Sequence, residues 1–213
     1  MNRTLFSQLL CLGIFTLCLG FSSPKAWAMS LEQQTIIYDT YSLENQKEYS
    51  KAIEKMIVLF HESSNDYFIN LRLGWLFYLN KQYANAILHY NRAALLAPNS
   101  IEPLLALSLI HNLVEDYAST IKICNKILAA DPKNLQALQR LISAEIRTQN
   151  DSDAEKNVAY GVDLYPTDPI FLEQKAFIKN KLGKKEEAKK ALTLLLVVNP
   201  SNEYARSQLH VKD

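Results

Sequence analysis

The fold of this chain is decided by residues 73–98, which read LGWLFYLNKQYANAILHYNRAALLAP. Apolar residues recur there at spacings of three and four, which is the period of one face of an α-helix. The polar segment 80–82 divides the stretch into two helices, and Pro98 follows the second. Gly74 and Ala86 remove bulk where two helices must approach, while aromatic side chains fill the space beside them. The stretch therefore predicts an antiparallel helical hairpin.

The same hairpin recurs along the chain at a constant interval. Prolines occupy positions 98, 132, 166 and 200, and alignment on them divides the chain into the blocks 67–100, 101–134, 135–168 and 169–202. Residues 33–66 keep Tyr49 and Ala52 at matching offsets but have Ser64 in place of the proline, so we interpret them as a degenerate leading repeat. Each proline is followed two residues later by a candidate helix cap: Ser100, Asn134, Asp168 and Asn202. Residues 203–213 are expected to form a C-terminal capping helix.

With these features the chain resembles the tetratricopeptide repeat (TPR) family, in its exported bacterial type. The repeat unit of that family carries Leu-Gly, an aromatic residue, Ala, a second aromatic residue, Ala and Pro at the offsets found in residues 73–98. The first block departs from the family at Asn70, where Trp is usual, and the later blocks match more loosely. The resemblance implies an all-α fold: an α-solenoid, a right-handed superhelix of antiparallel two-helix repeats with a C-terminal capping helix.

The resemblance also implies a concave groove that binds partners. In this family the groove is lined by the second, fifth, sixth, ninth, twelfth and thirteenth residues of each unit. Carried over, the expected groove residues are Tyr38, Tyr41, Phe68, Leu71, Arg72, Trp75, Tyr78, Leu105, Leu109, Asn112, Gln139, Arg140, Ser143, Arg147, Gln174 and Phe177. Exposed aromatic residues are enriched at binding hot spots, so Trp75 is the leading candidate. The alternative is that these side chains only pack against neighbouring helices.

Two arginines on one predicted helix are candidate ligand contacts. Arg140 and Arg147 offer guanidinium forks to a carboxylate or a phosphate, although a solvated helix face is the more ordinary explanation. Some TPR proteins hold the terminal carboxylate of a peptide with a set of Lys, Asn and Arg side chains, and that set is absent here. The corresponding positions are Leu71, Trp75, Ala106, Gln136 and Arg140, of which only the last matches.

Residues 1–28 predict a signal peptide. Arg3 gives a positive start, residues 9–21 form an apolar run, and Ala26 and Ala28 supply the small residues that signal peptidase needs. We expect cleavage after Ala28; a retained N-terminal membrane anchor is the alternative, although the run is shorter than the ~20 residues of a spanning helix. The expected location is the bacterial periplasm, with an extracellular location as the alternative.

Composition and motifs argue against several classes of function. Lys and Arg total 23 against 22 Asp and Glu, so no large field of one sign favours nucleic acid or an anionic membrane. Cys124 is the only cysteine after residue 28, so no internal disulfide is expected, and its place in the repeat predicts a buried packing residue. The histidines show no metal-ligand spacing: His61, His89, His111 and His210. No metal, no cofactor and no catalytic residue is expected, and the chain is predicted not to be an enzyme.

The sequence thus favours a non-enzymatic scaffold for protein-protein interaction. We expect it to bind a peptide or a helical segment of an envelope partner in the concave groove, and so to aid assembly of an envelope or secretion complex. The alternative is a structural protein that self-assembles into homo-oligomers through its edge or convex surfaces. This scaffold serves many partners, so the partner itself stays open.

Overall fold

The computed structural model describes residues 29–211, and the signal peptide expected at residues 1–28 lies outside them. The described chain consists of helices and short turns, with no strand among these residues. The helices are α1 Leu31–Asn45, α2 Tyr49–Glu62, α3 Tyr67–Leu79, α4 Tyr83–Leu96, α5 Glu102–Leu113, α6 Tyr117–Ala130, α7 Leu135–Arg147, α8 Asp151–Leu164, α9 Pro169–Lys181, α10 Lys185–Val198 and α11 Glu203–Gln208. None of these helices is long and apolar enough to cross a membrane.

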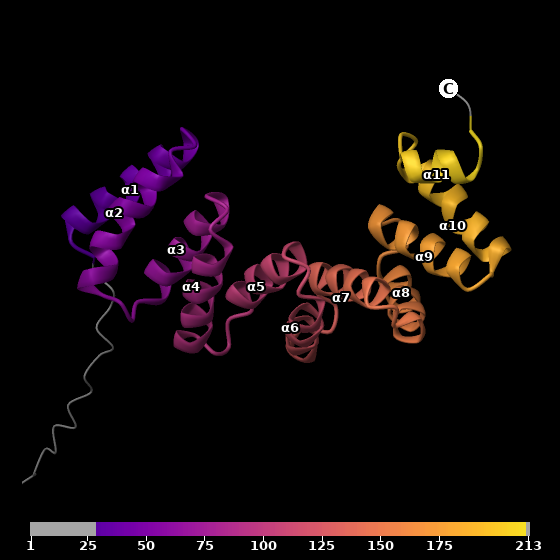
Figure 1. The fold of residues 1–213 in the computed structure, drawn as a ribbon, viewed down its shortest axis with the longest axis horizontal. Helices are drawn as coiled ribbons and strands as arrows, with labels where there is room; N and C mark the ends of the chain where they lie inside the picture. The colour runs from indigo at the N-terminus through magenta and orange to yellow at the C-terminus, as the bar shows by residue number, and fades with distance from the viewer. Residues whose placement is uncertain (1–28, 212–213) are drawn as a thin grey trace, which may run out of the picture.

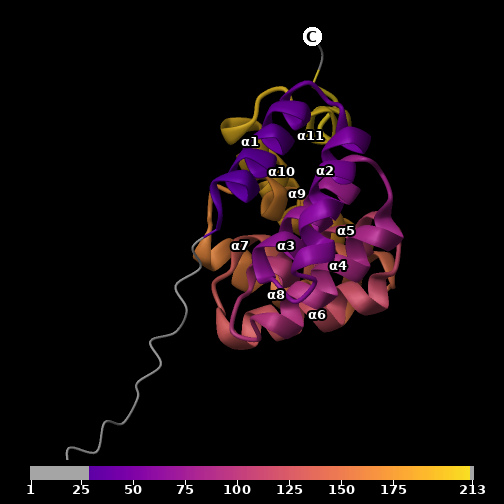
Figure 2. The same cartoon turned by 90° about the vertical axis from the view of Figure 1, so that its left-hand side faces the viewer.

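Consecutive helices pack in pairs, α1 with α2 and so on to α9 with α10, and each pair is joined by a tight turn. The first helices of the pairs end at residues spaced by 34: Asn45, Leu79, Leu113, Arg147 and Lys181. The pairs follow one another in an arc, with α5 and α7 on its inner side and α4, α6 and α8 on its outer side (Figure 1). The view along the array shows the helices winding around a common axis (Figure 2). This is the α-solenoid that the sequence predicts.

Small residues allow the close approach of the two helices in each pair. The second helices carry a fully buried small residue every 34 positions: Ala52, Ala86, Thr120, Ala154 and Ala188. On the facing helix α3, a Cβ atom added to Gly74 would lie 2.8 Å from the Tyr90 ring, so only glycine fits there without movement. The next pair has the buried residues Ser108 and Cys124 at these two positions. Cys124 is fully buried, which confirms the prediction of a packing cysteine, and this burial raises the pKa of its thiol to about 11.

Each tight turn contains one residue in the left-handed backbone conformation. These residues are again 34 positions apart and have φ angles between 60° and 73°: Lys47, Lys81, Glu115, Gln149 and Gly183. The first pair of helices therefore has the same internal turn as the four pairs that follow, although Ser64 replaces the proline that comes after the second helix in the other pairs. A left-handed residue with a side chain costs about 1–2 kcal/mol, whereas glycine adopts this conformation freely.

Polar caps begin the first helices of the later pairs. Three of the predicted caps accept hydrogen bonds of 2.8–3.0 Å from backbone N–H groups of the next turn: Asn134, Asp168 and Asn202. The fourth, Ser100, lies one residue before the N-cap Ile101 of α5, and its hydroxyl accepts a 3.4 Å hydrogen bond from the backbone N–H of Glu102, the first residue of that helix. The same hydroxyl also shares a 3.0 Å hydrogen bond with the hydroxyl of Tyr67.

The C-terminal helix is shorter than the expected 203–213. Helix α11 ends at Gln208, and His210 adopts a φ of 53°, so the chain turns instead of continuing as a helix. Ala205 of α11 is fully buried, and Tyr204 and Leu209 pack against the last pair of helices. The short helix therefore covers part of the end of the array.

Asn70, where the TPR family usually has Trp, belongs to a buried polar cluster. Its amide Nδ2 donates to the backbone oxygens of Ser64 and Asp66 at 2.8 and 2.7 Å, and its Oδ1 lies 3.1 Å from Nδ1 of His89. The His89 ring stacks on Phe77, and burial lowers its pKa. Because each amide group has a partner, the cluster keeps the local fold without the indole.

We expect Lys81→Gly to raise the free energy of unfolding by about 0.5–1 kcal/mol, because glycine relieves the left-handed strain at some cost in chain entropy. The reverse change, Gly183→Ala, should lower it by about 1 kcal/mol. A Cβ atom at Gly183 meets no atom within 4 Å, so this variant tests the backbone conformation alone. Urea unfolding followed by circular dichroism measures both changes. A Gly183→Ala protein as stable as the parent would contradict the assigned turn.

Candidate binding groove

The first helices of the pairs form the inner side of the arc. Helix α7 packs directly against both α5 and α9, whereas α3 and α5 contact each other less closely. The backbones of α1, α3 and α5 are therefore farther apart than those of α5, α7 and α9, and side chains occupy the space between them. Two hollows lie on this inner side, one toward each end of the array.

The N-terminal hollow has a volume of about 500 Å³ and is the larger of the two. It is lined by Tyr41, Tyr67, Phe68, Leu71, Arg72, Trp75, Tyr90, Glu102 and Ala106. Five of these were predicted groove residues, and they come from α1 and α3. Tyr67, Tyr90 and Glu102 were not predicted. Gly74 could have indicated Tyr90 from the sequence. Because Gly74 has no side chain, the ring of Tyr90 packs against the backbone of α3 at that position.

Trp75 lies at the rim of the N-terminal hollow. Its indole Nε1 donates to Glu44 Oε1 at 2.7 Å, and its ring centroid lies 5.6 Å from that of Tyr78. The side chain is nevertheless 39% exposed. The indole thus packs against the leading pair of helices and is also partly exposed in the groove. Packing against a neighbouring helix and exposure to a partner, which the sequence analysis gave as alternatives, both apply to Trp75.

Arg72 lines the N-terminal hollow, but its guanidinium is bound within the protein. Its side chain is buried, with an ion pair of 2.5 Å between Nη1 and Glu44 Oε2. The guanidinium carbon lies 3.9 Å from the centroid of the Tyr41 ring, and Nη2 is 3.4 Å from the Thr40 hydroxyl. The guanidinium therefore joins α3 to α1, and because it is buried, few of its N–H groups are accessible to a ligand.

Arg140 and Gln174 join neighbouring pairs in a related way. Arg140 Nη1 donates to the backbone oxygen of Leu105 and to the hydroxyl of Ser108, both at 2.9 Å. Gln174 Nε2 donates to the backbone oxygen of Gln139 at 2.9 Å. In both cases the sixth residue of one repeat reaches the carbonyl of the fifth residue of the repeat before it. This corrects the expectation that Arg140 offers a fork to a ligand, because its donors are used within the protein.

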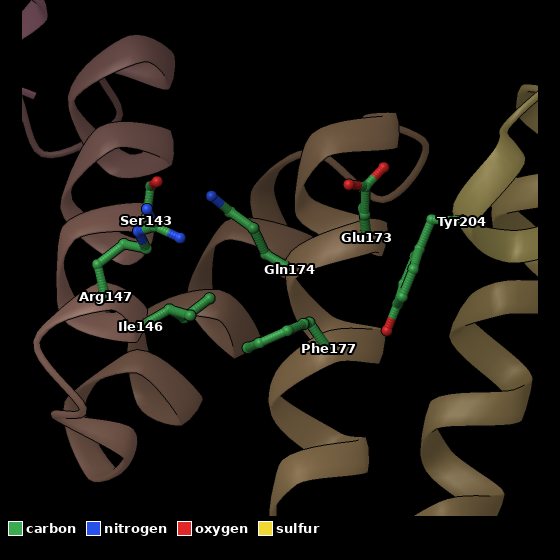
Figure 3. Close-up of a pocket in the computed structure, with 7 residues that line it drawn as sticks. All are labelled: Ser143, Ile146, Arg147, Glu173, Gln174, Phe177 and Tyr204. Atoms are coloured by element: carbon green, nitrogen blue, oxygen red, sulfur yellow. The ribbon is translucent and has the colours of Figure 1, made fainter. Parts of the chain in front are cut away.

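The C-terminal hollow has a volume of about 320 Å³ and lies between α7, α9 and α11 (Figure 3). It is lined by Ser143, Ile146, Arg147, Glu173, Gln174, Phe177 and Tyr204. Phe177 is 44% exposed and lies between Ile146 and Tyr204 (Figure 3). Arg147 is exposed, and its Nε donates to the Tyr117 hydroxyl at 3.1 Å. Sequence reasoning placed Tyr204 only in the capping helix, so its place in this hollow was missed.

The other predicted groove residues lie between or beside the two hollows. Tyr78, Leu105, Leu109 and Asn112 are half-buried, and the amide of Gln139 donates to both carboxylate oxygens of Asp168. Phe68 also lines a smaller hollow of about 320 Å³ with Tyr38, which is 70% exposed. The structure therefore distributes the predicted residues along the groove and does not gather them into one pocket.

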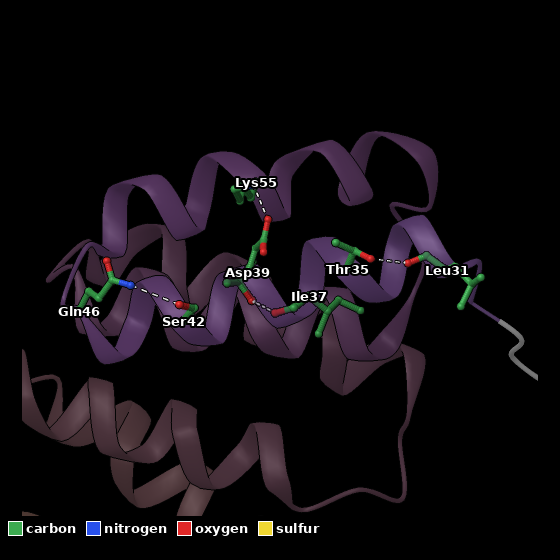
Figure 4. A network of polar contacts seen from close by, with 8 residues as sticks. Leu31, Thr35, Ile37, Asp39, Ser42, Gln46 and Lys55 are labelled. Carbon is green, nitrogen blue, oxygen red and sulfur yellow. Dashed lines mark hydrogen bonds and ion pairs between the residues drawn. The ribbon is translucent and has the colours of Figure 1, made fainter.

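Polar contacts within α1 and between α1 and α2 lie at the N-terminal end of the array (Figure 4). The Thr35 hydroxyl donates to the backbone oxygen of Leu31 at 2.8 Å, and Gln46 Nε2 donates to the Ser42 hydroxyl at 3.2 Å. An ion pair of 2.6 Å between Lys55 and Asp39 ties α2 to α1. These local bonds suit the end of a repeat array, since within residues 29–211 no pair of helices comes before α1 and α2.

The described residues offer binding surfaces and no metal site. Among residues 29–211, no three or more His, Cys, Asp or Glu side chains are placed to hold a metal ion. The histidines have other surroundings: His89 is buried in the Asn70 cluster, and His111 Nδ1 lies 2.9 Å from the Asp116 carboxylate. What the groove presents to a ligand is aromatic surface, amide groups and a few charges.

Arg140→Ala should lower the free energy of unfolding by about 1–3 kcal/mol, because it removes the two hydrogen bonds that the guanidinium donates from α7 to the Leu105 carbonyl and the Ser108 hydroxyl of α5. Arg147→Ala is the matched control on the same helix, and its exposed side chain should change stability by less than about 0.5 kcal/mol. Chemical unfolding of the two variants provides the comparison. Equal losses would show that Arg140 does not join α7 to α5 in solution.

Comparison with known proteins places this fold among solved structures. The chain superposes on MamA from Desulfovibrio magneticus RS-1 with a TM-score of 0.75 and 15% identity, over 83% of this chain and 99% of the other. It superposes on YrrB, a TPR protein with an unusual peptide-binding site, with a TM-score of 0.70 and 11% identity, over 83% and 91% of the two chains. No protein-family model and no curated protein matches the sequence. The chain is similar to these proteins in fold, and that fold is the TPR α-solenoid.

Proposed function

We propose that the protein is a non-enzymatic interaction scaffold that binds a segment of another protein along its inner groove. The observation that supports this most is the aromatic surface at the N-terminal end, where Tyr38, Tyr41 and Trp75 are 70%, 44% and 39% exposed. Trp and Tyr bury a large area on binding and lose few rotamers. The peptide-binding site named for YrrB, which has the same fold, also favours a groove that binds peptides.

The N-terminal hollow has the properties of a preformed anchor site. Its volume of about 500 Å³ lies within the range of ~300–1,000 Å³ that is usual for ligand sites. The hydrogen bond from Trp75 to Glu44 and the position of Arg72 over Tyr41 hold the walls in place before any ligand arrives. A rigid wall reduces the entropy lost on binding, so these contacts favour affinity.

We expect Trp75→Ala to abolish the selection of peptides from a random library displayed on phage, because it removes the indole that lines the N-terminal hollow. The immobilised protein is the chain from Met29 onward, which carries every described helix. Tyr160→Ala is the matched control, because Tyr160 is 41% exposed on the outer helix α8 and should leave selection unchanged.

Circular dichroism of both variants checks that the helices are retained. Equal peptide selection by the parent and by Trp75→Ala would remove the groove from the proposed function. Light scattering of the same samples reports the molecular mass, and a mass that rises with concentration would instead favour the self-assembly alternative.

We further propose that the protein acts in the cell envelope, where it aids the assembly of an envelope or secretion complex. The support is the predicted signal peptide of residues 1–28, which lies outside the described residues. The described fold begins directly after it: Met29 packs against the core, and Ser30 caps α1 with a 3.1 Å hydrogen bond to Gln33. Cleavage after Ala28 would therefore leave every described contact in place.

The protein recovered from cells should begin at Met29, which intact-mass measurement and N-terminal sequencing can test. Ala28→Tyr should block the cleavage, because signal peptidase accepts only small residues at that position. A parent protein that begins at Met1 and stays in the membrane fraction would contradict the cleavage and support the retained anchor.

A further inference from the structure

We infer that the N-terminal hollow selects a partner segment in which a Lys or Arg lies beside a bulky apolar residue. The inference rests on the proposed function and adds the chemistry of the segment to it. The main evidence is the carboxylate of Glu102, which lines this aromatic hollow and forms no ion pair with a Lys or Arg of the described residues.

The charges at the hollow do not cancel. Arg72 and Glu44 form an ion pair, so together they contribute no net charge. Glu102 is exposed at the first residue of α5, and its Oε2 accepts a 3.0 Å hydrogen bond from the Tyr67 hydroxyl. Within the part of the chain that the structure describes, no Lys or Arg nitrogen lies within 4.0 Å of its carboxylate. A ligand that enters the hollow therefore meets one free negative charge.

The charge of Glu102 affects the pKa of two tyrosines that line the hollow, Tyr67 and Tyr90. Burial raises the pKa of Tyr67, and the hydrogen bond to Glu102 raises it further. Burial also raises the pKa of Tyr90, and the charge of Glu102 adds to that effect. Both phenols are therefore neutral donors at pH 7, so they do not compete with Glu102 for a cation.

The aromatic walls suit the same kind of group. Lys and Arg are attracted to the faces of Trp and Tyr rings, and the attraction grows where water is excluded. The hollow already contains one such contact, since the Arg72 guanidinium lies 3.9 Å from the centroid of the Tyr41 ring. A second cation, from the partner, would pair with Glu102 and lie against Tyr67. The apolar surfaces of Phe68, Leu71 and Trp75 are then left for the neighbouring bulky side chain.

The charge of the array also favours a basic segment at this end. Residues 29–66 carry three Lys against seven Asp and Glu, a net charge of −4. Residues 169–211 carry eight Lys and Arg against four Glu, a net charge of +4. The C-terminal hollow holds both Arg147 and Glu173, so it has no comparable preference of its own. Long-range attraction brings a basic segment to the N-terminal end, and an acidic segment is repelled there.

The test uses a random peptide library displayed on phage, selected on the chain from Met29 onward. The parent should enrich peptides with Lys or Arg next to Trp, Phe, Tyr or Leu. Glu102→Lys should reverse this preference and enrich Asp or Glu at the same place. For one enriched basic peptide, Glu102→Gln should weaken binding by about tenfold, as measured by fluorescence polarisation, and added salt should weaken binding to the parent.

Glu54→Gln is the matched control, because it removes an exposed carboxylate of the same acidic region from the outer helix α2. It should change the affinity less than twofold if the effect of Glu102 is local, since distant exposed charges are screened. Circular dichroism confirms that the variants are folded.

The outcomes separate this inference from the proposed function. Peptides that require Trp75 but show no basic preference, or whose binding is unchanged in Glu102→Gln, would overturn the inference and leave the scaffold function standing. Selection that does not depend on Trp75 would overturn both. Equal weakening in Glu54→Gln would show that the overall charge, and not Glu102 in the hollow, attracts the segment.

Discussion

The close approach of two helices, repeated at a constant interval along the chain, is the contact on which the rest of the structure depends. In α3 and α4 the Tyr90 ring packs onto the backbone at Gly74, and the next pair has Ser108 and Cys124 at the same two positions. One such pair cannot bury both of its faces, so the pairs stack, and the constant interval keeps their buried residues in step. The left-handed turns recur at the same interval, so the first helix of each pair ends at the same position of its repeat. Within residues 29–211, stability therefore arises from many similar contacts and not from one core or a disulfide.

The bonds between neighbouring pairs decide what the groove presents. Arg72, Arg140 and Gln174 all occupy the sixth position of their repeats, and each contacts the first helix of the preceding pair. Their polar atoms are used within the protein, so the side chains at the ninth position, such as Trp75, carry more of the exposed surface. Among the described residues no helix precedes α1, and Tyr38, at the sixth position of its repeat, is 70% exposed.

The two ends of the groove differ in chemistry because they differ in what fills the space between helices. Toward the N-terminus, α3 and α5 are less closely packed, and the gap contains aromatic rings, one ion pair and the free carboxylate of Glu102. Toward the C-terminus, α7 and α9 are in direct contact, and the hollow holds charges of both signs. A partner segment bound along this groove would meet a different environment at each end, which gives the groove a direction.

The helices, their pairing, the constant repeat interval and the burial of Cys124 could be predicted from the sequence, because they follow from the spacing of apolar, small and turn residues along the chain. The resemblance also identified five residues of the N-terminal hollow. The sequence did not reveal that the guanidinium groups of Arg72 and Arg140 are bound within the protein, nor that Tyr67, Tyr90 and Glu102 line one hollow. The reason is physical: the contact between Arg140 and Leu105 joins residues 35 positions apart on neighbouring pairs. The distance between such residues depends on how one pair is rotated against the next, and no spacing within a single repeat contains that rotation.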